Sequence, residues 1–279
     1  MDDVYSLFQR CFPQFSVPWN IFWELLSFEK CRIYKKEKND VCIGISVWEG
    51  NKIRLLMVDP EFRRQGIGQE LLQYSEAKMK EAGYDKVILG GNDSKLFLGA
   101  IISKEEWERK ISNYFAKRGY AAENRCLEMQ LKLDNFIYPK DSLLYPEKIR
   151  FEYYTGKKDK LWKAVAKVDK EWVQYFKQDY SIYVAMEEDE IAAFCILIFE
   201  DKALLCSVDT KVGSIGCVGT VPKKRNRGIG LSMVGMATLE LQKHGCDISW
   251  IHYTYLDWWY KKLGYETYLR FWLGHKRLR

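Results

Sequence analysis

The sequence predicts an α+β protein made of two similar domains in tandem, each with a mixed, mostly antiparallel sheet flanked by helices. The first observation is an internal repeat: Pro60-Glu61-Phe62-Arg63-Arg64-Gln65-Gly66-Ile67-Gly68 is matched by Pro222-Lys223-Lys224-Arg225-Asn226-Arg227-Gly228-Ile229-Gly230, offset by 162 residues. The second is the order of the elements around each copy. Hairpin strands come first, and strand, loop, helix and strand follow, which is typical of an α+β layer.

In the first half, apolar periodicity predicts two short helices over 4–11 and 19–28. Alternating and β-branched segments predict strands over 31–36, 41–48 and 52–58. A helix is expected from Gln65 onward, because Leu71, Leu72, Ala77 and Met79 form an apolar stripe and Gly83 is a candidate C-cap. A strand over 86–89 follows.

The second half predicts the same series. We expect a strand over 149–154, a helix over 160–176, and a strand pair over 182–186 and 191–199 joined by an acidic turn at 187–190. A strand over 214–221 leads into the second loop, a helix over 231–243 ends before Gly245, and a strand over 248–253 follows.

These series place a first domain at 1–138, a linker at 139–148, where Pro, Asp and Ser cluster, and a second domain at 149–279. The later landmark Gly119-Tyr120 is matched by Gly264-Tyr265 at an offset of only 145, so the first copy carries 17 extra residues. The segment 92–99, which lies in this insertion, either shapes a pocket or serves packing.

Composition limits the function classes. With 279 residues, 47% of them apolar, the chain is globular and long enough for two domains. The longest apolar run is far shorter than the roughly 20 residues of a membrane span, and the acidic start lacks the basic region of a secretory signal, so we expect a cytoplasmic protein. Eight cysteines without a Cys-x-x-Cys pair, and only three histidines, predict buried reduced thiols and no metal site.

The net charge of +6 weakly favours an anionic ligand. Nucleic-acid binding is not expected, because the only dense basic clusters are 223–227 and the tail 275–279, which we interpret as a solvated end. Binding of nucleic acid through 223–227 remains the weakest of three hypotheses.

The repeated loop predicts a phosphate site. A glycine-rich turn from a strand into a helix leaves the first helical N–H groups free, and the helix dipole adds positive potential there. Glycines let the backbone approach a pyrophosphate closely, and arginines add charge-assisted bonds. The alternative is a helix start whose arginines merely face solvent, which the duplication makes less attractive. Neither copy ends in the Gly-Lys-Ser/Thr of a triphosphatase loop or has the third glycine of a dinucleotide fingerprint.

At this point the residues resemble a known family. Val58-Asp59-Pro60-Glu61-Phe62-Arg63-Arg64-Gln65-Gly66-Ile67-Gly68 looks like the acetyl-CoA motif of the GNAT (GCN5-related) N-acetyltransferases. The second copy has Thr220 where that family usually has Val. Trp259-Tyr260-Lys261-Lys262-Leu263-Gly264-Tyr265 resembles the family's later aromatic string. The tandem arrangement is similar to that of mycothiol synthase and its relatives.

The resemblance implies acetyl-CoA as the acyl donor and an amine as the acceptor. In the family's pattern, the pantetheine arm pairs with the strand before the loop like an added strand, and the pyrophosphate lies on the loop. The residues that this pattern places at the cofactor are Met57, Val58, Arg63, Arg64, Gln65, Gly66, Ile67 and Gly68 in the first copy, and Gly219, Thr220, Arg225, Asn226, Arg227, Gly228, Ile229, Gly230 and Leu231 in the second.

GNAT chemistry, as the resemblance implies, is direct attack of the amine on the thioester, with a tyrosine that commonly returns a proton to the thiolate. Tyr260 lies four residues before Gly264, where the family keeps this acid, whereas the first copy has Phe115. We therefore expect chemistry in the C-terminal domain. Tyr260 could instead be a packed aromatic, and Tyr114 could replace Phe115 if the local register shifted by one.

The general base is less evident. His252 lies mid-strand and is either a base or a hydrogen-bonded core histidine, while Asp257 and the turn 187–190 have no specific support. Cys217 as a covalent carrier is unnecessary for direct transfer. The predicted function is an acetyl-CoA-dependent N-acetyltransferase acting on a small amine or a peptide amine. The alternative is a non-catalytic coenzyme A-binding sensor or interaction protein, and the sequence leaves the oligomeric state open.

Overall fold

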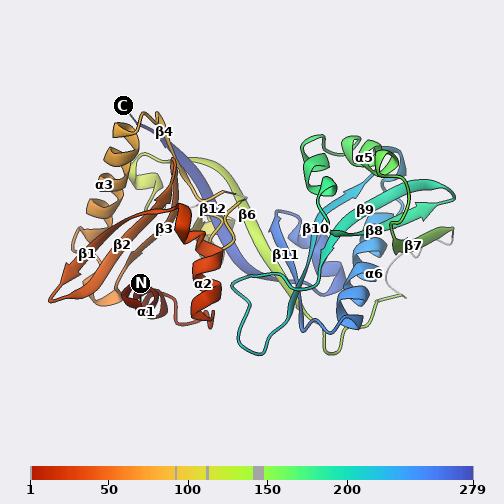
Figure 1. Cartoon of the computed structure of the whole chain (residues 1–279), viewed down its shortest axis with the longest axis horizontal. Coiled ribbons are helices and arrows are strands. Elements are labelled where there is room, and N and C mark those ends of the chain that lie inside the picture. Colours follow the sequence, from red (N-terminus) through yellow and green to blue (C-terminus); the bar gives the residue numbers. More distant parts are fainter. Residues whose placement is uncertain (1, 92, 111–112, 141–147, 279) are drawn as a thin grey trace. The chain divides into compact units, whose positions relative to one another are not determined.

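The computed structural model describes residues 2–91, 93–110, 113–140 and 148–278, which form two compact units (Figure 1). The first unit contains residues 1–127, 202–209 and 269–279, and the second contains residues 128–201 and 210–268. Both combine a sheet with helices, so the predicted α+β class and the tandem domain type are confirmed.

The first unit follows the predicted order of elements. Its sheet has the strand order β1-β2-β3-β4-β12-β6, with the short β5 paired to β12. Its elements are α1 (Asp2–Cys11), α2 (Trp19–Leu26), β1 (Arg32–Lys38), β2 (Val41–Glu49), β3 (Lys52–Val58), α3 (Ile67–Glu81), β4 (Lys86–Leu89), β5 (Ala100–Ile101), α4 (Lys104–Arg109) and the start of β6 (Ala121–Lys132), with 3-10 turns at Phe28–Lys30, Pro60–Phe62 and Ala116–Arg118.

The second unit repeats the pattern. Its strands follow the order β6-β11-β10-β9-β8-β7. Its elements are β7 (Ile149–Tyr153), α5 (Lys158–Ala166), β8 (Ser181–Glu187), β9 (Glu190–Ile198), β10 (Val212–Thr220), α6 (Ile229–Lys243), β11 (Ile248–Thr254), α7 (Asp257–Tyr260) and the start of β12 (Glu266–Arg277), with 3-10 segments at Glu171–Lys177, Pro222–Lys224 and Lys261–Leu263.

The repeat seen in the sequence is also a repeat of structure. Helices α3 and α6 begin and end at positions offset by 162 residues, and each starts after a left-handed glycine, Gly66 or Gly228. In both units the strand before the loop pairs in parallel with the strand after the helix, β3 with β4 and β10 with β11, whereas the hairpin neighbours are antiparallel. These parallel pairs make each sheet mixed, as predicted.

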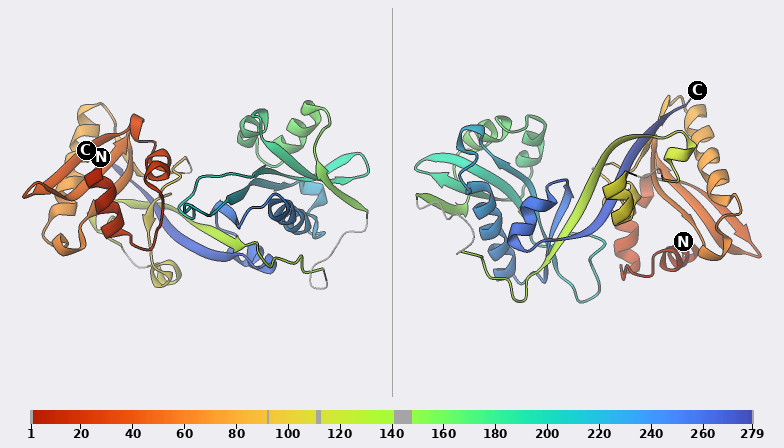
Figure 2. Two further views of the ribbon diagram at one scale, coloured as in Figure 1. Left: turned by 60° about the horizontal axis from the view of Figure 1, so that its bottom comes forward. Right: turned by 180° about the vertical axis from the view of Figure 1, so that it is seen from behind.

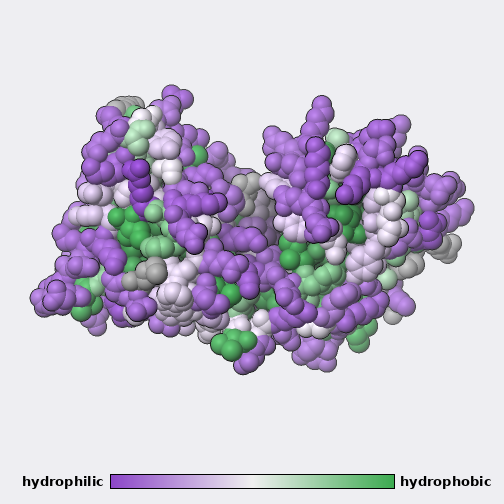
Figure 3. All heavy atoms as spheres, viewed as in Figure 1, coloured by the Kyte–Doolittle hydropathy of each residue, from purple (hydrophilic) through white to green (hydrophobic). Residues whose placement is uncertain are grey.

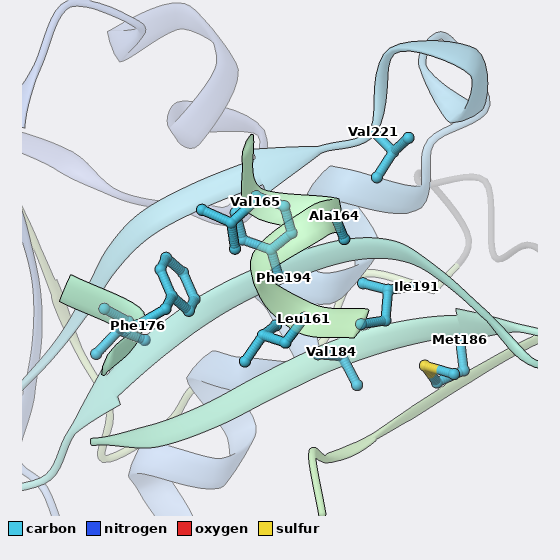
Figure 4. Close-up of a cluster of buried hydrophobic side chains, with 10 residues drawn as sticks. Leu161, Ala164, Val165, Phe176, Val184, Met186, Ile191, Phe194 and Val221 are labelled. Atoms are coloured by element: carbon cyan, nitrogen blue, oxygen red, sulfur yellow. The ribbon is translucent and has the colours of Figure 1, made fainter. Parts of the chain in front are cut away.

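The two faces of the second unit's sheet are covered by different helices. Leu161 and Val165 of α5 pack on Val184 and Phe194 of β8 and β9, and all four side chains are buried (Figure 4). Helix α6 contacts β8, β9 and β10, and its Glu240 accepts a hydrogen bond from a tyrosine of β7. Each buried leucine, valine or phenylalanine side chain contributes about 1.5–3 kcal/mol through removal of apolar surface from water.

Three expectations need correction. The helix over 160–176 is interrupted: α5 ends at Ala166, and a separate 3-10 segment follows at Glu171–Lys177. The long strands β6 and β12, visible side by side in Figure 2, did not emerge from the local pattern. The tail is not a solvated end, because 275–277 of β12 pair with 86–88 of β4.

Strands β6 and β12 each contribute residues to both units, so the units exchange segments of the chain. The division into 1–138 and 149–279 therefore stays a prediction about two homologous halves, and most of the linker, 141–147, lies outside the described residues.

The face drawn in Figure 3 is mostly hydrophilic, with small scattered hydrophobic areas. None of the described helices has the length and apolarity to cross a membrane. All eight cysteines are free thiols, five of them buried, as predicted. The described residues contain no group of three or more His, Cys, Asp or Glu side chains arranged to hold a metal ion.

Candidate active site

The two loops have the same backbone. The first arginine of each loop is Arg63 or Arg225. The residues that follow them, Arg64 and Asn226, are left-handed, with φ of 62° and 61°. Each first arginine turns back onto the strand that precedes the loop: Arg225 Nε donates to the carbonyl of Thr220 at 3.1 Å, and Arg63 Nε donates to the carbonyl of Val58 at 3.0 Å. This arginine holds the turn in both units, so the repeat preserves a structural contact as well as a charge.

The N-terminus of α6 is available to an anion. No side chain caps it, and its first turn contains no acidic residue. The preceding loop carries four cations, at 223, 224, 225 and 227, and no anion, and two of them, Lys224 and Arg227, are paired with Glu187 of β8. Free helical N–H groups, the helix dipole and the other two cations together favour an anion at this site.

A cavity of about 1000 Å³ opens at this helix start. Its wall brings together the end of β10, the loop, the start of α6 and α7. Of the predicted residues in the second copy, those that line it are Gly219, Thr220, Arg225, Asn226, Gly228, Ile229, Gly230, Leu231 and Tyr260. Two distant motifs of the sequence therefore meet at one cavity within one unit.

Arg227 does not line this cavity. Its guanidinium forms an ion pair with Glu187, whose carboxylate also accepts from Lys224 Nζ at 2.6 Å. The two cations lower the pKa of Glu187 to about 2. Glu187 is part of the acidic turn considered for the general base. Its ion pairs with Lys224 and Arg227 connect the loop to β8.

Tyr260 lies at the end of α7 and is 5% exposed. It packs edge-on against Trp259 and lines the cavity. Burial raises the pKa of the Tyr260 phenol. The group therefore stays protonated at neutral pH, as a proton donor must.

The corresponding site of the first unit has an aromatic ring at the same place. The phenol oxygen of Tyr114 lies 3.1 Å from where a Cβ on Gly68 would stand, and Trp259 of the second unit lies 3.5 Å from the corresponding point on Gly230. The Arg118 guanidinium stacks over the Tyr114 ring, 3.6 Å from its centroid. The charge differs: the first copy carries Glu61 and Glu70, of which Glu70 is paired with Lys36 at 2.8 Å, where the second copy has Lys223 and Ser232.

The space beside β3 is also reduced. Phe97, from the inserted segment, is 6% exposed and packs against Phe12 at a centroid distance of 5.0 Å. Phe12, Phe97 and Phe115 line a cavity of only about 200 Å³ there. The segment 92–99 was expected either to shape a pocket or to serve packing. Phe97 packs within the first unit and also lines this small cavity. Asn92 lies outside the described residues. Phe115 occupies the position equivalent to Tyr260, and Met57 of β3 is buried.

The candidate bases have distinct surroundings. Asp257 is paired with Lys261 at 2.7 Å on α7. Burial raises the pKa of the Cys217 thiol to about 11, so this cysteine is not an activated nucleophile. His252 on β11 has its Nδ1 2.8 Å from Oε1 of Glu128, a fully buried carboxyl on β6.

The family model for the acetyltransferase (GNAT) family matches residues 1–96 and 145–265, which is most of the chain and covers both copies of the loop. The chain belongs to the GNAT acetyltransferase family. A search of curated protein sequences gave no match.

Solved structures of GNAT proteins share the fold. A GCN5-related glucosamine N-acetyltransferase region of a fungal multi-domain GH3 β-N-acetylglucosaminidase matches 98% of this chain with a TM-score of 0.77 and 21% identity, and the match spans 36% of that protein. A tandem GNAT protein from the clavulanic acid biosynthesis pathway matches over 100% of this chain and 94% of its own, with a TM-score of 0.63 and 12% identity. A GCN5-related N-acetyltransferase from Sphaerobacter thermophilus gives 0.60 and 16% identity, covering 86% of this chain and 78% of its own. At these identities the likeness concerns the fold.

Sequence reasoning missed part of this GNAT site. Lys224, Trp258 and Lys262 also line the cavity, together with Val168 from the segment after α5. Lys224 could have been found from the basic run of the loop, and Trp258 from its position in the aromatic string. Val168 carries no local signal, because only the folding of α5 over the sheet brings it there. Glu128 was missed for the same reason, since it lies in an unpredicted strand.

Proposed function

We propose that the second unit binds acetyl-CoA and transfers its acetyl group directly to the amine of a small molecule or a peptide. The observation that carries this proposal is the single cavity in which an uncapped, cation-rich helix start and the protonated phenol of Tyr260 are brought together. Phosphates at the start of α6 and an acid that lines the same cavity are what an acyl-CoA transferase needs.

In this proposal Arg225, Asn226 and the N–H groups from Gly228 to Leu231 hold the pyrophosphate. The pantetheine arm pairs with β10 near Gly219 and Thr220, where β10 has separated from β11. The amine nitrogen attacks the thioester carbonyl, the carbon–sulfur bond breaks, and the thiolate takes the Tyr260 proton. Tyr260 is therefore the residue that we assign to catalysis.

The first loop receives a weaker assignment. Met57, Val58 and the residues from Arg63 to Gly68 keep the motif, but Phe97 narrows the space beside β3, and the first copy has Glu61 and Glu70 where the second has no acidic residue. We propose that the first unit supports the fold and that one acetyl-CoA binds per chain.

The test is acetyl transfer to a panel of amines, followed by release of free thiol from acetyl-CoA and by the mass of the product. The panel includes glucosamine, because one structural neighbour is named as a glucosamine N-acetyltransferase region, and a peptide with a free N-terminus. Thiol release that requires an amine and yields an acetylated amine supports the proposal. Binding of acetyl-CoA without turnover on any amine contradicts it and favours a non-catalytic coenzyme A-binding protein.

A further inference from the structure

His252 has a ring nitrogen without a hydrogen-bond partner. Its Nδ1 is bonded to Glu128 at 2.8 Å, but its Nε2 is buried and has no hydrogen-bond partner in the described part of the chain. Buried polar atoms of native proteins almost always have a partner, and an exception calls for a water, an ion or a ligand. Eight such side-chain atoms occur among the described residues, and Nε2 of His252 is one of two that lie on β11, next to the point where β10 and β11 separate.

The strand places His252 on a definite face of the sheet. The hydroxyl of Ser249 bonds to Tyr265, which bonds to Thr238 of α6, so Ser249 points toward α6. Side chains alternate along a strand, so Trp250 and His252 point to the opposite face. Their rings are 4.6 Å apart, in agreement with that placement.

The neighbouring strand β10 opens beside this histidine. Strands β10 and β11 pair from Val212↔Ile248 to Ser214↔Trp250 and no further in the described register. Continued by two residues, that register would place Gly216 opposite His252. A Cβ at Gly216 would meet nothing within 4 Å, and the register of β10 with β9 is broken between Gly216 and Gly219. The sheet therefore has a gap beside Gly216, on the strand next to that of His252.

The gap at Gly216 lies along β10 from the loop that we assign to the pyrophosphate, within reach of the pantetheine arm. Gly216 precedes Thr220 by four residues, which is roughly 13 Å at most at about 3.3 Å per residue, and less because Cys217 is left-handed. An arm that starts at the loop and pairs along β10 reaches the gap with its far end. The reacting end of an acyl donor would then lie beside His252.

We propose that His252, oriented by Glu128, is the general base that takes the proton from the acceptor amine. This rests on the proposed function. An ionised Glu128 accepts from Nδ1–H, which leaves the lone pair on Nε2 free for the proton. As the amine nitrogen bonds to the thioester carbon, one N–H proton passes to Nε2 and the thiolate leaves with the Tyr260 proton. The imidazolium proton then returns to the tyrosinate through water, so the net products are the amide and the free thiol.

The electrostatics of the pair suit this cycle. Burial raises the pKa of Glu128 above its usual value, and the hydrogen bond from His252 offsets part of that rise. Glu128 also raises the pKa of Tyr268 on β12, and that phenol is held neutral mainly by burial. Glu128 in its ionised form stabilises the imidazolium that forms when His252 takes a proton. Glu128 is a positioning residue, and His252 is the group that touches the amine.

The first experiment determines the tautomer directly, and it needs no acceptor. The chain has three histidines, so ¹⁵N-labelled histidine gives few imidazole signals, and His244→Gln and His275→Gln assign the remaining one to His252. We expect His252 with the proton on Nδ1 and a bare Nε2 in the wild type. In Glu128→Gln, whose amide can donate to Nδ1, we expect the opposite tautomer. A wild-type proton on Nε2 overturns the proposal, whatever the activity.

The second experiment compares rates on the best acceptor of the amine panel. We expect His252→Gln and Glu128→Gln to lower kcat roughly 10²–10⁴-fold while the Kd for acetyl-CoA stays within about twofold. His244→Gln is the matched control, because His244 is exposed and stacks on Phe199 away from the cavity. We expect its rate to equal that of the wild type. Wild-type turnover that survives in His252→Gln overturns the base, whereas a wild type that acetylates nothing overturns the proposed function and leaves the tautomer result standing.

Discussion

One acetyl-CoA per chain, bound at the second loop, is the prediction that separates the two units. Arg225→Ala and Arg63→Ala are matched changes, because each removes an exposed arginine whose Nε donates to the carbonyl that ends the preceding strand. Both variants lose the same hydrogen bond, which contributes about 1 kcal/mol to stability at most. Any difference in cofactor affinity therefore comes from the ligand.

The magnitude follows from what each arginine faces. Arg225 lines the 1000 Å³ cavity, and its remaining N–H groups are free to meet a phosphate. A hydrogen bond to a charged group contributes about 1.5–3 kcal/mol, and 1.4 kcal/mol corresponds to tenfold in Kd. We expect Arg225→Ala to weaken acetyl-CoA binding about 10- to 150-fold. Arg63 lies in a loop that also carries Glu61, and the cavity beside β3 is only about 200 Å³, so we expect Arg63→Ala to change the Kd less than about twofold.

Isothermal titration calorimetry with coenzyme A measures both affinity and stoichiometry, and the unreactive ligand avoids turnover. We expect one site per chain in the wild type and in Arg63→Ala. Two equivalent sites, or an equal loss of affinity in the two variants, would refute the asymmetry between the units.

Three further predictions concern stability. Arg227 and Lys224 lower the pKa of Glu187 from 4.5 to about 2. The stability that Glu187 adds is therefore complete above about pH 4.5 and is lost as the pH falls toward 2. The difference in urea midpoint between wild type and Glu187→Gln should shrink over that window, and a difference that grows would contradict the ion pairs. Phe97→Ala should destabilise the protein by about 3–5 kcal/mol in urea unfolding, because it empties a buried position among Phe8, Phe12 and Phe15, and a loss below about 1 kcal/mol would show that the insertion does not fill the core. Deleting 275–279 should lower Tm by several degrees, because Lys276 pairs with Glu76 at 2.7 Å and 275–277 pair with β4; an unchanged Tm would mean that the tail is dispensable.

Much of the fold could be read from the sequence because it depends on local pattern. Strand β4 has the predicted bounds, and β3 does as well. The glycines that start α3 and α6 were identifiable because a left-handed residue is required there. Strands β6 and β12 were not, because charged and polar residues at their ends, such as Glu123 and Lys276, hide the alternation that pairing with neighbours makes possible.

The residues of the candidate site also divide into those with a local sequence signal and those without one. The loop and Tyr260 could be proposed as site residues because their motifs are continuous in sequence. The small space beside β3 could not be predicted, because Phe97 packs there only when the chain folds. The Glu128–His252 pair joins residues that are 124 positions apart, and no spacing rule connects them.

The most direct test of chemistry in the second unit compares acetyl transfer by Tyr260→Phe and Tyr114→Phe. Tyr114 is the neighbour of Phe115, the residue of the first unit that is equivalent to Tyr260. Each variant removes one phenol oxygen, and free thiol release on the best acceptor reports the rate. The proposed asymmetry predicts a loss of roughly 10²–10⁴-fold in kcat for Tyr260→Phe at unchanged acetyl-CoA affinity, and a wild-type rate for Tyr114→Phe. Full activity in Tyr260→Phe together with a loss in Tyr114→Phe would place the chemistry in the first unit and contradict the assignment.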